Sequence, residues 1–313
     1  MTSELPGDYS LDVEALPEDH RAGFVSIVGK PNVGKSTTVN AYMGQKIAIV
    51  SPKPQTTRRR ALGILTLDRA QIIFVDTPGI HKPFHKLGES MVNTAVEAIP
   101  DADVLVWLVD GSREPSGQDR AVARFIANQA GQIPVLLGLN KSDLVQEADR
   151  AERLDAFLEL FQPSAHMFFS ATDGENRDAF LELVIDHLPP GPRFYPSDQV
   201  TDQTERVIAA ELIREQVLLH TRQEVPHAAE VVVDEFKERS SDLIYIHATV
   251  LVERATQKGI LLGRGGSMIK EISKAARLEI EKLLDSRVYL ELWVKVRPKW
   301  RHKESELRRL GFH

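Results

Sequence analysis

Residues 29–36 combine two glycines, a lysine and a serine at the spacing of a phosphate-binding loop, Gly-Lys-Pro-Asn-Val-Gly-Lys-Ser. The backbone N–H groups of such a loop surround a β-phosphate, so we expect Gly29 and Gly34 to take backbone angles closed to other residues. Lys35 then reaches the β- and γ-phosphates, and the Ser36 hydroxyl ligates Mg²⁺. The segment predicts a nucleotide site with contacts from Gly29, Lys30, Pro31, Asn32, Val33, Gly34, Lys35, Ser36 and Thr37.

A second polar segment, Asn-Lys-Ser-Asp at residues 140–143, follows an apolar run. The Asp143 carboxylate can accept hydrogen bonds from N1–H and the 2-amino group of guanine. Adenine offers neither donor there, so bound ATP would leave a carboxylate unpaired. Asn140 can tie the segment to the phosphate-binding loop, and the Lys141 stem can cover a face of the base. We predict a guanine site formed by Asn140, Lys141, Ser142 and Asp143, with a backbone N–H from Ser170, Ala171 or Thr172 reaching guanine O6.

Residues 76–79, Asp-Thr-Pro-Gly, end another apolar run and fit the Mg²⁺ and γ-phosphate side of the same site. We expect Asp76 to hold Mg²⁺ through water, and the Gly79 amide to contact the γ-phosphate and so to sense hydrolysis. A threonine of the polar segment 54–58, Pro-Gln-Thr-Thr-Arg, can close over Mg²⁺, and we favour Thr57 over Thr56. The predicted nucleotide contacts here are Asp76, Thr77, Pro78 and Gly79, the Mg²⁺ ligands are Ser36, Thr57 and Asp76, and the groups acting in hydrolysis are Lys35, Thr57 and Gly79.

The elements that must position these residues alternate between strand-like and helix-length stretches from residue 23 to about residue 188. Strands separated by helices indicate βαβ units, and they predict an α/β domain with a doubly wound, mostly parallel sheet. Ligands of such sheets bind at the carboxyl ends of the strands, where each polar segment above lies. The expected strands are residues 24–28, 61–67, 71–75, 104–109, 135–139 and 166–169.

The pattern changes at residues 189–203, which contain four prolines and which we interpret as an extended linker. The elements expected beyond it have the order α-β-β-α-α-β and predict an α+β domain with helices on one face of a three-stranded sheet. They are a helix over 204–223, strands over 229–236 and 243–253, a short turn at 263–266, a helix to about 284 and a strand over 288–296. We therefore expect an acidic tail (1–22), an α/β domain (23–188), the linker, an α+β domain (204–297) and a basic C-terminal tail (298–313).

The composition is that of an ordinary globular chain of 313 residues with 42% hydrophobic residues and no cysteine. The missing cysteines exclude disulfides, thiolate metal sites and a cysteine nucleophile, and they suit a reducing cytoplasm. No apolar run approaches the length of a transmembrane helix, and the first twenty residues carry six acids and no Lys or Arg, so we expect no secretory signal. Residues 254–313 hold fifteen Lys or Arg against seven Asp or Glu, which fits either a solvated basic surface or nucleic-acid binding.

Together, the nucleotide segments resemble the five motifs of translation-factor-type GTPases in order and spacing: 29–36, 55–59, 76–79, 140–143 and 170–172. Gly-Arg-Gly-Gly at 263–266 resembles the G-x-x-G loop of a KH domain, and the α-β-β-α-α-β order is that of the bacterial, type II form. The C-terminal residues 290–297, Trp300 and 310–312 are similar to those of the Era GTPases, as is 54–58. The resemblance covers roughly residues 23–313.

The resemblance implies an assembly factor for the small (30S) ribosomal subunit that hydrolyses GTP to GDP and phosphate. Its KH domain would bind 16S rRNA near the 3′ end, and GTP or GDP with Mg²⁺ would be its cofactors. The family also implies a cytoplasmic protein that associates peripherally with the inner face of the membrane, and we expect a monomer. We keep open a signalling GTPase whose C-terminal domain binds protein, and an RNA-binding structural factor with a vestigial nucleotide site.

RNA contacts are expected at the G-x-x-G loop, because glycines at a helix N-terminus let an RNA backbone approach closely. The predicted RNA-binding residues are Gly263, Arg264, Gly265, Gly266, Lys258, Lys270, Lys274, Lys295, Arg297 and Lys299. Trp293 alternates with Leu292 and Val294 on a predicted strand, and we expect it in the core. Trp300 fits either stacking on a base or packing.

Ile80 occupies the position after the Asp-x-x-Gly motif, where many GTPases have a glutamine that orients the attacking water. An apolar side chain cannot orient water by hydrogen bonding, so we expect slow intrinsic turnover. In related GTPases with an apolar residue here, an asparagine of the phosphate-binding loop helps to bind K⁺. The resemblance therefore makes Asn32 a K⁺ ligand by hypothesis.

Overall fold

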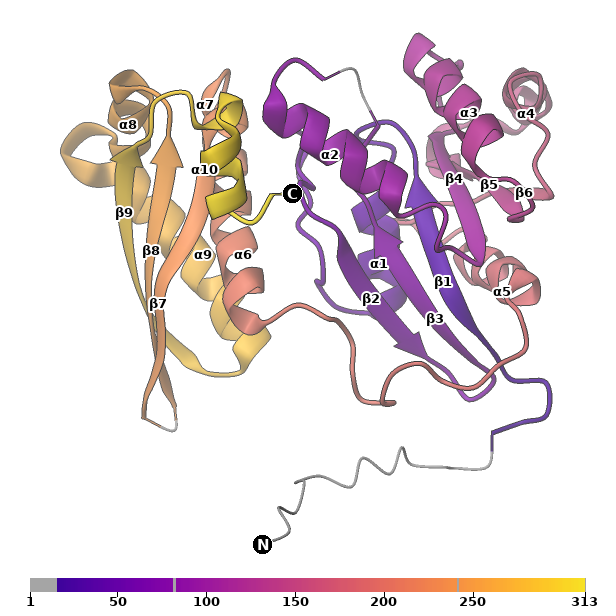
Figure 1. Cartoon of the computed structure of the whole chain (residues 1–313), viewed down its shortest axis with the longest axis horizontal. Helices are drawn as coiled ribbons and strands as arrows, with labels where there is room; N and C mark the ends of the chain where they lie inside the picture. The colour runs from indigo at the N-terminus through magenta and orange to yellow at the C-terminus, as the bar shows by residue number, and fades with distance from the viewer. Residues whose placement is uncertain (1–15, 81–82, 241, 313) are drawn as a thin grey trace, which may run out of the picture.

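The computed structural model describes residues 16–80, 83–240 and 242–312, and Figure 1 shows the two sheets that it contains. The first fifteen residues of the predicted acidic tail lie outside the described residues, as does His313. A six-stranded sheet belongs to the N-terminal half and a three-stranded sheet to the C-terminal half. We call the two halves the G domain and the KH domain.

The G domain contains a sheet with the strand order β2-β3-β1-β4-β5-β6. Only β2 runs antiparallel to its neighbour, so the sheet is mostly parallel, and the predicted fold class is confirmed. Three strands, β3, β4 and β5, are buried along their whole length, as expected for a sheet covered on both faces. The bounds are β1 Arg21–Val28, β2 Ala61–Thr66, β3 Ala70–Asp76, β4 Val104–Asp110, β5 Val135–Asn140 and β6 Ala165–Phe168.

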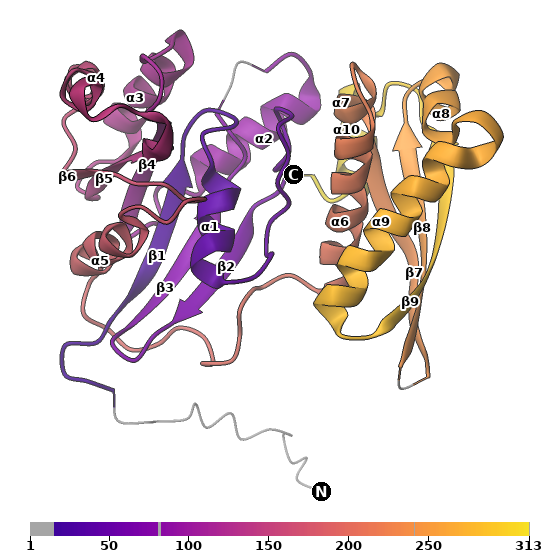
Figure 2. The same cartoon turned by 180° about the vertical axis from the view of Figure 1, so that it is seen from behind.

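Helices cover both faces of this sheet (Figures 1 and 2). Apolar side chains of α1 and α5 pack on one face, and those of α3 and α4 pack on the other, where α2 also lies. Helix α3 begins with a capping box in which the Ser116 and Asp119 side chains each bond the other's backbone N–H. The bounds are α1 Lys35–Met43, α2 Lys86–Glu97, α3 Gly117–Gln129, α4 Arg150–Leu158 and α5 Arg177–His187.

The proline-rich segment after α5 runs along the edge of the G-domain sheet. Ile64 N–H donates to the Val200 carbonyl at 2.9 Å, and Leu62 N–H donates to Asp202 Oδ1 at 3.1 Å. Further back, Gln71 Nε2 donates to the Tyr195 carbonyl at 2.8 Å. The segment therefore partners the exposed edge of β2 and is held against the G domain before the chain enters the KH domain.

The KH domain has the strand order β7-β8-β9, with β7 and β8 antiparallel and β8 and β9 parallel. Helices α6 and α9 lie in front of the sheet in Figure 2, and their apolar residues form one core with the inner faces of the strands. The predicted order is confirmed, with a short helix α7 in addition. The bounds are α6 Glu205–His220, α7 Val225–Ala228, β7 Glu230–Ser240, β8 Leu243–Val252, α8 Ala255–Leu262, α9 Ser267–Leu284 and β9 Arg287–Val296.

The residues after β9, which we expected to be a basic tail, are folded. They form a turn at Trp300–His302 and the helix α10 Glu304–Arg309. Trp300 is fully buried and packs with Leu307 and Phe312 against Leu87 and Met91 of α2. We call this segment, residues 298–312, the C-terminal clasp, because it joins the end of the KH domain to a helix of the G domain.

The two C-terminal tryptophans take different places in the structure, and only Trp293 departs from its expected one. Trp300 has a packing role, and its Nε1 donates to the Ala228 carbonyl at 2.9 Å, so it cannot stack on a base. Trp293, expected in the core, is 53% exposed. Strand alternation explains this, because partly buried Leu292 and buried Val294 face the helices and the residue between them must face outward.

Among the described helices, none is both long and apolar enough to cross a membrane.

Matched substitutions of these two tryptophans test the packing. Trp300→Ala should lower the free energy of unfolding by roughly 3–5 kcal/mol, because it removes a fully buried aromatic side chain. Trp293→Ala should lower it by less than about 1 kcal/mol, because its ring is half exposed. Chemical denaturation measures both, and equal losses would contradict the structure.

Candidate nucleotide site and nucleic-acid interface

The phosphate-binding loop joins β1 to α1, and its glycines are needed for two different reasons. Gly34 has a φ of 106°, and a Cβ there would lie 2.2 Å from Asn140 Nδ2. Gly29 is absent from the positive-φ positions, so the expectation of an unusual backbone angle is wrong for it. A Cβ on Gly29 would instead lie 2.3 Å from the Leu108 carbonyl oxygen, so Gly29 is required for space.

Lys35 begins α1 and turns its side chain back across the loop. Its Nζ donates to the carbonyls of Gly29 and Lys30 at 3.3 and 3.2 Å, and the residue is buried. Burial lowers the pKa of Lys35 to about 8, although the nearby Asp76 carboxylate opposes this shift. A phosphate in the loop would favour the charged ammonium, which is the form that the predicted role requires.

Three oxygen-bearing side chains from three elements converge beside Lys35. Ser36 Oγ lies 2.8 Å from Thr57 Oγ1 and 2.6 Å from Asp76 Oδ2, and Thr57 Oγ1 lies 3.4 Å from the same carboxylate oxygen. The second oxygen, Asp76 Oδ1, is buried and has no hydrogen-bond partner among the described residues. Hydroxyl and carboxylate oxygens are ligands that Mg²⁺ prefers, so this cluster fits the ion.

The same geometry separates the two threonines of the loop. Thr56 Oγ1 lies 2.7 Å from Ser51 Oγ and donates to the Lys53 carbonyl at 2.7 Å, so it serves the loop itself. Thr57 is the threonine that faces Ser36 and Asp76. Thr57 is therefore the threonine that lies with the other expected Mg²⁺ ligands, and its contact with the ion stays a prediction.

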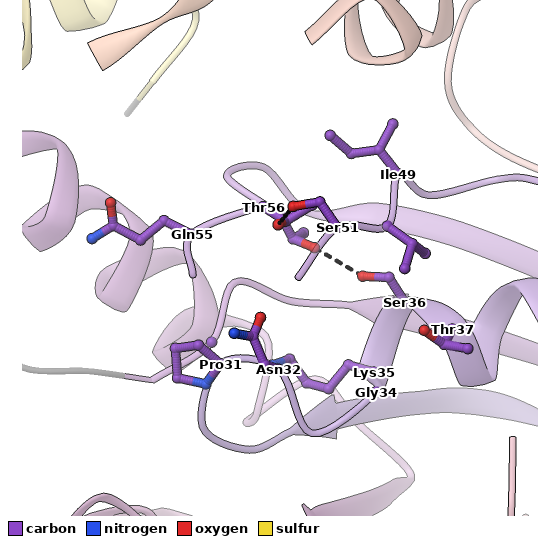
Figure 3. Close-up of a pocket in the computed structure, with 13 residues that line it drawn as sticks. Pro31, Asn32, Gly34, Lys35, Ser36, Thr37, Ile49, Ser51, Gln55 and Thr56 are labelled. Carbon is purple, nitrogen blue, oxygen red and sulfur yellow. Dashed lines mark hydrogen bonds between the residues drawn. The ribbon is translucent and has the colours of Figure 1, made fainter. Parts of the chain in front are cut away.

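A pocket lies between the phosphate-binding loop and the loop that joins α1 to β2 (residues 44–60), which we call the α1–β2 loop. In Figure 3, Pro31, Asn32 and Lys35 lie on one side, and Ser51 and Thr56 lie on the other. Asn32 bridges the two sides, because its Nδ2 donates to the Pro52 carbonyl at 3.2 Å. The residues expected to hold the phosphates therefore form one wall of this pocket.

The predicted guanine segment is tied to its neighbours by Asn140. Its Nδ2 donates to the Val33 carbonyl at 2.8 Å, as expected, and its Oδ1 accepts from Ala171 N–H at 3.0 Å. Lys141 Nζ contacts the Asn32 carbonyl at 3.0 Å and Asp110 Oδ2 at 2.6 Å. The Asp143 side chain is exposed beside this network, and its guanine contact and the O6 contact of 170–172 stay predictions.

Residues 79 and 80 lie directly against the phosphate-binding loop. Ile80 N–H donates to the Gly29 carbonyl at 3.1 Å, and a Cβ on Gly79 would lie 2.8 Å from the backbone nitrogen of Pro31. The Ile80 side chain packs on the apolar cluster between the sheet and the helices α3 and α4. It faces the core and cannot hydrogen-bond a water, which agrees with the expectation from its residue type.

Sequence reasoning missed the arginine that follows Thr57. Arg58 is buried, its Nη1 lies 2.6 Å from Glu230 Oε2, and it donates to the carbonyls of Ala229 and His227 at 2.6 and 3.0 Å. Burial raises the pKa of Glu230, but Arg59 and Arg58 outweigh it and hold the pKa below its ordinary value. No local pattern marks Arg58, because its partners lie about 170 residues away in sequence.

Helix α6 of the KH domain holds the rest of the α1–β2 loop. Glu215 is buried, and its Oε1 accepts from Val50 N–H at 2.8 Å while its Oε2 lies 2.5 Å from Lys46 Nζ. Arg214, also buried, donates to the Thr56 carbonyl. The loop that carries Thr57 is therefore bound along its length by KH-domain side chains.

The G-x-x-G loop joins α8 to α9. Gly265 and Gly266 have φ angles of 58° and 79°, and a Cβ on either would meet nothing within 4 Å. The chain around them is open to a ligand, and Arg264 is exposed beside them. Of the predicted RNA-binding cations, Lys258 lies on α8, and Lys270 and Lys274 lie on α9.

The cations at the end of the chain are arranged differently. Lys295 lies on β9 with its Nζ 5.9 Å from the ring centre of Trp293, on the face of the sheet away from the helices. Arg297 and Lys299 follow β9 and are exposed. The structure therefore does not bring Lys295 to the helical side of the sheet, where α8 and α9 carry the G-x-x-G loop.

Asp143→Asn tests the guanine assignment. An asparagine presents a donor where N1–H of guanine also donates, so GTP affinity should fall about a hundredfold and xanthosine triphosphate should become the preferred ligand. Asp149→Asn, a second exposed carboxylate nearby, is the matched control and should bind GTP like the unchanged protein. Fluorescent nucleotide titration gives both affinities, and unchanged GTP binding by Asp143→Asn would exclude this carboxylate as the base contact.

Comparison with family models agrees with the two-domain arrangement. A model described as "50S ribosome-binding GTPase" matches residues 24–141, and a KH-domain model matches residues 224–301.

Two curated relatives share nearly the whole chain. GTPase Era of Ruminiclostridium cellulolyticum is 47% identical over 295 residues, which are 94% of this chain and 98% of the relative. GTPase Era of a Nostoc species is 47% identical over an alignment of 316 positions that covers 99% of this chain and 94% of the relative.

Two solved structures of similar length have the same fold. A variant of Aquifex aeolicus Era bound to GDP and AlF4⁻ has a TM-score of 0.89 at 37% identity and covers 93% of this chain and 99% of its own. Era in complex with MgGDPNP and nucleotides 1506–1542 of 16S ribosomal RNA has a TM-score of 0.87 at 37% identity and covers 94% and 99%. With nearly half of its residues identical to relatives matched over almost their full length, this chain belongs to the Era family of GTPases.

Proposed function

We propose that this protein is a GTP-hydrolysing switch that binds 16S rRNA near its 3′ end through the KH domain and assists assembly of the 30S ribosomal subunit. Family membership supports the GTPase activity, and the related complex with MgGDPNP and 16S rRNA supports the choice of 16S rRNA as the bound RNA. The family model that matches the G domain is described by binding to the 50S subunit, but the RNA in that complex is 16S rRNA. We therefore favour the small subunit as the partner.

One observation carries the switch. Thr57 lies in the oxygen cluster that fits Mg²⁺, and the next residue, Arg58, is buried in the KH domain. A change that draws Thr57 towards the metal site, or releases it, must therefore move a side chain that the KH domain holds. Because GTP and GDP differ at the γ-phosphate beside this loop, they would favour different placements of the two domains.

The Arg58–Glu230 pair suits this role better than a purely stabilising one. A buried ion pair recovers little more than the cost of removing its charges from water, whereas the loss of one partner leaves an uncompensated charge. The pair therefore selects one arrangement of the domains without locking it. A second contact, between the C-terminal clasp and α2, attaches the segment that follows Gly79 to the same half of the molecule.

In hydrolysis, the residues of this chain position the phosphates and leave the water poorly oriented. Lys35 and the loop amides would hold the β- and γ-phosphates, Gly79 would contact the γ-phosphate, and Ser36, Thr57 and Asp76 would hold Mg²⁺. The bound ion would neutralise charge that develops on the phosphates. Since Ile80 offers no hydrogen bond, the GTP state would be long-lived and would act as a timed signal.

The remaining parts of the proposal rest on the resemblance. Peripheral association with the inner face of the membrane, a cytoplasmic location and a monomeric state stay predictions.

The switch is tested by RNA affinity in two nucleotide states. Fluorescence anisotropy with a single-stranded RNA from the 3′ end of 16S rRNA should give affinities that differ about fivefold or more between GDP and a non-hydrolysable GTP analogue. Arg58→Met should bring this ratio close to one, because the loop then loses its charged contact with the KH domain. Arg60→Met, an exposed arginine of the same loop, should keep the ratio.

Two results would count against the proposal. Equal RNA affinities in the unchanged protein would reject a nucleotide-controlled RNA switch. A preserved ratio in Arg58→Met would show that the two sites communicate by another route.

K⁺ is the last element of the proposal. Asn32 lies where the phosphate-binding loop meets the α1–β2 loop, and its Nδ2 donates to the Pro52 carbonyl at 3.2 Å, so its side-chain amide and that carbonyl would be within reach of one monovalent cation. GTP hydrolysis should be faster in KCl than in NaCl at equal ionic strength, because K⁺ would stabilise the negative charge that develops on the phosphates and so offset the poorly oriented water. Phosphate release measures the rates, and identical rates would remove K⁺ from the mechanism.

A further inference from the structure

The three-stranded sheet of the KH domain has one face covered by helices and one face that carries aromatic rings. Figure 2 shows α6 and α9 in front of the sheet, and Figure 1 looks onto the opposite face. Tyr245 on β8 pairs directly with Tyr289 on β9, and Trp293 lies four residues further along β9. Tyr289 is 59% exposed and Trp293 is 53% exposed. We call this surface the outer aromatic face, formed by Arg239, Tyr245, His247, Tyr289, Trp293 and Lys295.

The rings of this face are held in fixed positions. The Tyr245 and Tyr289 rings lie 5.9 Å apart and nearly parallel, at 20°. The Glu291 carboxylate joins Tyr245 to Trp293, because it accepts a hydrogen bond from the Tyr245 hydroxyl at 2.9 Å and another from Trp293 Nε1 at 2.8 Å. His247 meets the Trp293 ring edge-on at 5.8 Å. Exposed rings that are already ordered lose little entropy when a flat ligand stacks on them.

Among the described residues of this face, two cations have no carboxylate partner within ion-pair distance. Glu235 is paired with Lys237, and Asp242 is paired with Arg287. In the described part of the chain, Arg239 and Lys295 instead lie over rings, with the Arg239 guanidinium carbon 4.0 Å from the Tyr245 centroid and Lys295 Nζ 5.9 Å from that of Trp293. The positive groups that remain available therefore flank the aromatic rings.

We propose that the outer aromatic face is a second binding surface for single-stranded RNA, distinct from the G-x-x-G loop. Bases would stack on Tyr289 and Trp293, while Arg239 and Lys295 would contact phosphates, which is the combination that single-stranded nucleic acid requires. The inference deepens the proposed function and rests on its RNA-binding part.

The chemistry of the face favours RNA over a protein partner. Among the described residues of β7, β8 and β9, the large apolar side chains that are exposed are Tyr289 and Trp293, and both are aromatic. Protein interfaces of this size combine aromatic anchors with other buried apolar groups, which this face does not present. Nucleobases need flat rings and nearby positive charge, and both are present.

The position of β9 gives the RNA a continuous path. It is the edge strand of the sheet and packs against α8 and α9, the helices that the G-x-x-G loop joins. Lys295 lies on the outer face near the end of β9, and exposed Arg297 and Lys299 follow it. An RNA held at the G-x-x-G loop can therefore continue around the edge of the sheet onto the outer face.

Tryptophan fluorescence gives a direct test. The chain has three tryptophans, and Trp107 and Trp300 are fully buried, so stacking of a base should quench mainly the emission of Trp293. Titration with a single-stranded RNA of about twenty nucleotides, long enough to span both surfaces, should quench it. The Gly265→Asp variant, which weakens the G-x-x-G contact, should still be quenched at higher RNA concentration.

Affinity measurements with variants complete the test. Trp293→Ala and Tyr289→Ala should each weaken binding of the long RNA about tenfold, whereas Trp293→Phe should retain most of it because the ring is kept. Binding of an RNA short enough to occupy the G-x-x-G groove alone should not change. Leu278→Ala, which removes a 51% exposed apolar side chain from α9, is the matched control and should bind both RNAs normally.

The outcomes separate this inference from the proposed function. If the unchanged protein binds no single-stranded RNA, the RNA-binding function itself fails, and this surface with it. If it binds RNA but Trp293 is not quenched and the alanine variants bind the long RNA normally, the outer face alone is overturned. Normal RNA binding combined with loss of cosedimentation with 30S subunits in Trp293→Ala would assign the face to a protein partner and also overturn the RNA assignment.

Discussion

The arrangement of the two domains depends on one buried ion pair between distant parts of the chain. Arg58 lies near the end of the α1–β2 loop of the G domain, and Glu230 begins the first strand of the KH domain. Each charge alone would cost several kcal/mol to remove from water. Neither side chain can therefore be buried unless the two domains are placed so that Arg58 and Glu230 meet. The carbonyls of Ala229 and His227 complete the Arg58 contacts, and they too reach Arg58 only in this arrangement of the two domains.

The surroundings of this ion pair make the observed arrangement of the two domains specific but not maximally stable. Arg59 pairs with Glu211 and Glu230, and Arg214 pairs with Glu211, so the charges around this pair share partners and do not form isolated ion pairs. Arg58 Nε and Arg214 Nη1 are buried and, among the described residues, lack hydrogen-bond partners. Unsatisfied buried donors cost free energy. A switch needs two arrangements of similar free energy, and an interface with these defects can open without a large loss.

Local patterns in the sequence predicted the elements of both domains, because strand and helix periods and turn residues act over short distances. The succession along the chain of the six G-domain strands and of the KH-domain elements followed from them, whereas the order of the strands within the larger sheet did not. Arg58 was not predictable, since its carboxylate partner is 172 residues away and no nearby residue indicates that it is buried. Gly29 was assigned the wrong physical reason, because the close approach of Leu108 is a tertiary contact.

The two C-terminal tryptophans, one expected in the core and one left open between stacking and packing, differ in what the sequence could have revealed. Trp293 lies between two residues that face the core, so strict alternation already required it to face outward, and its apolar character was given too much weight. Trp300 lies outside any periodic element, and its burial depends on α2, more than 200 residues earlier.

The same alternation has a consequence for how the KH domain can contact RNA. A strand of this sheet that buries one row of side chains under the helices must present the other row to solvent, so β9 cannot serve the helical side alone. Its outward row contains Tyr289, Glu291, Trp293 and Lys295, a sequence of rings and charges that contributes nothing to the core. A half-exposed tryptophan at a solvent-facing position of a sheet retains an unfavourable contact with water. Because Glu291 also fixes the orientation of that ring, the strand keeps a flat apolar surface ready for a ligand instead of folding it away.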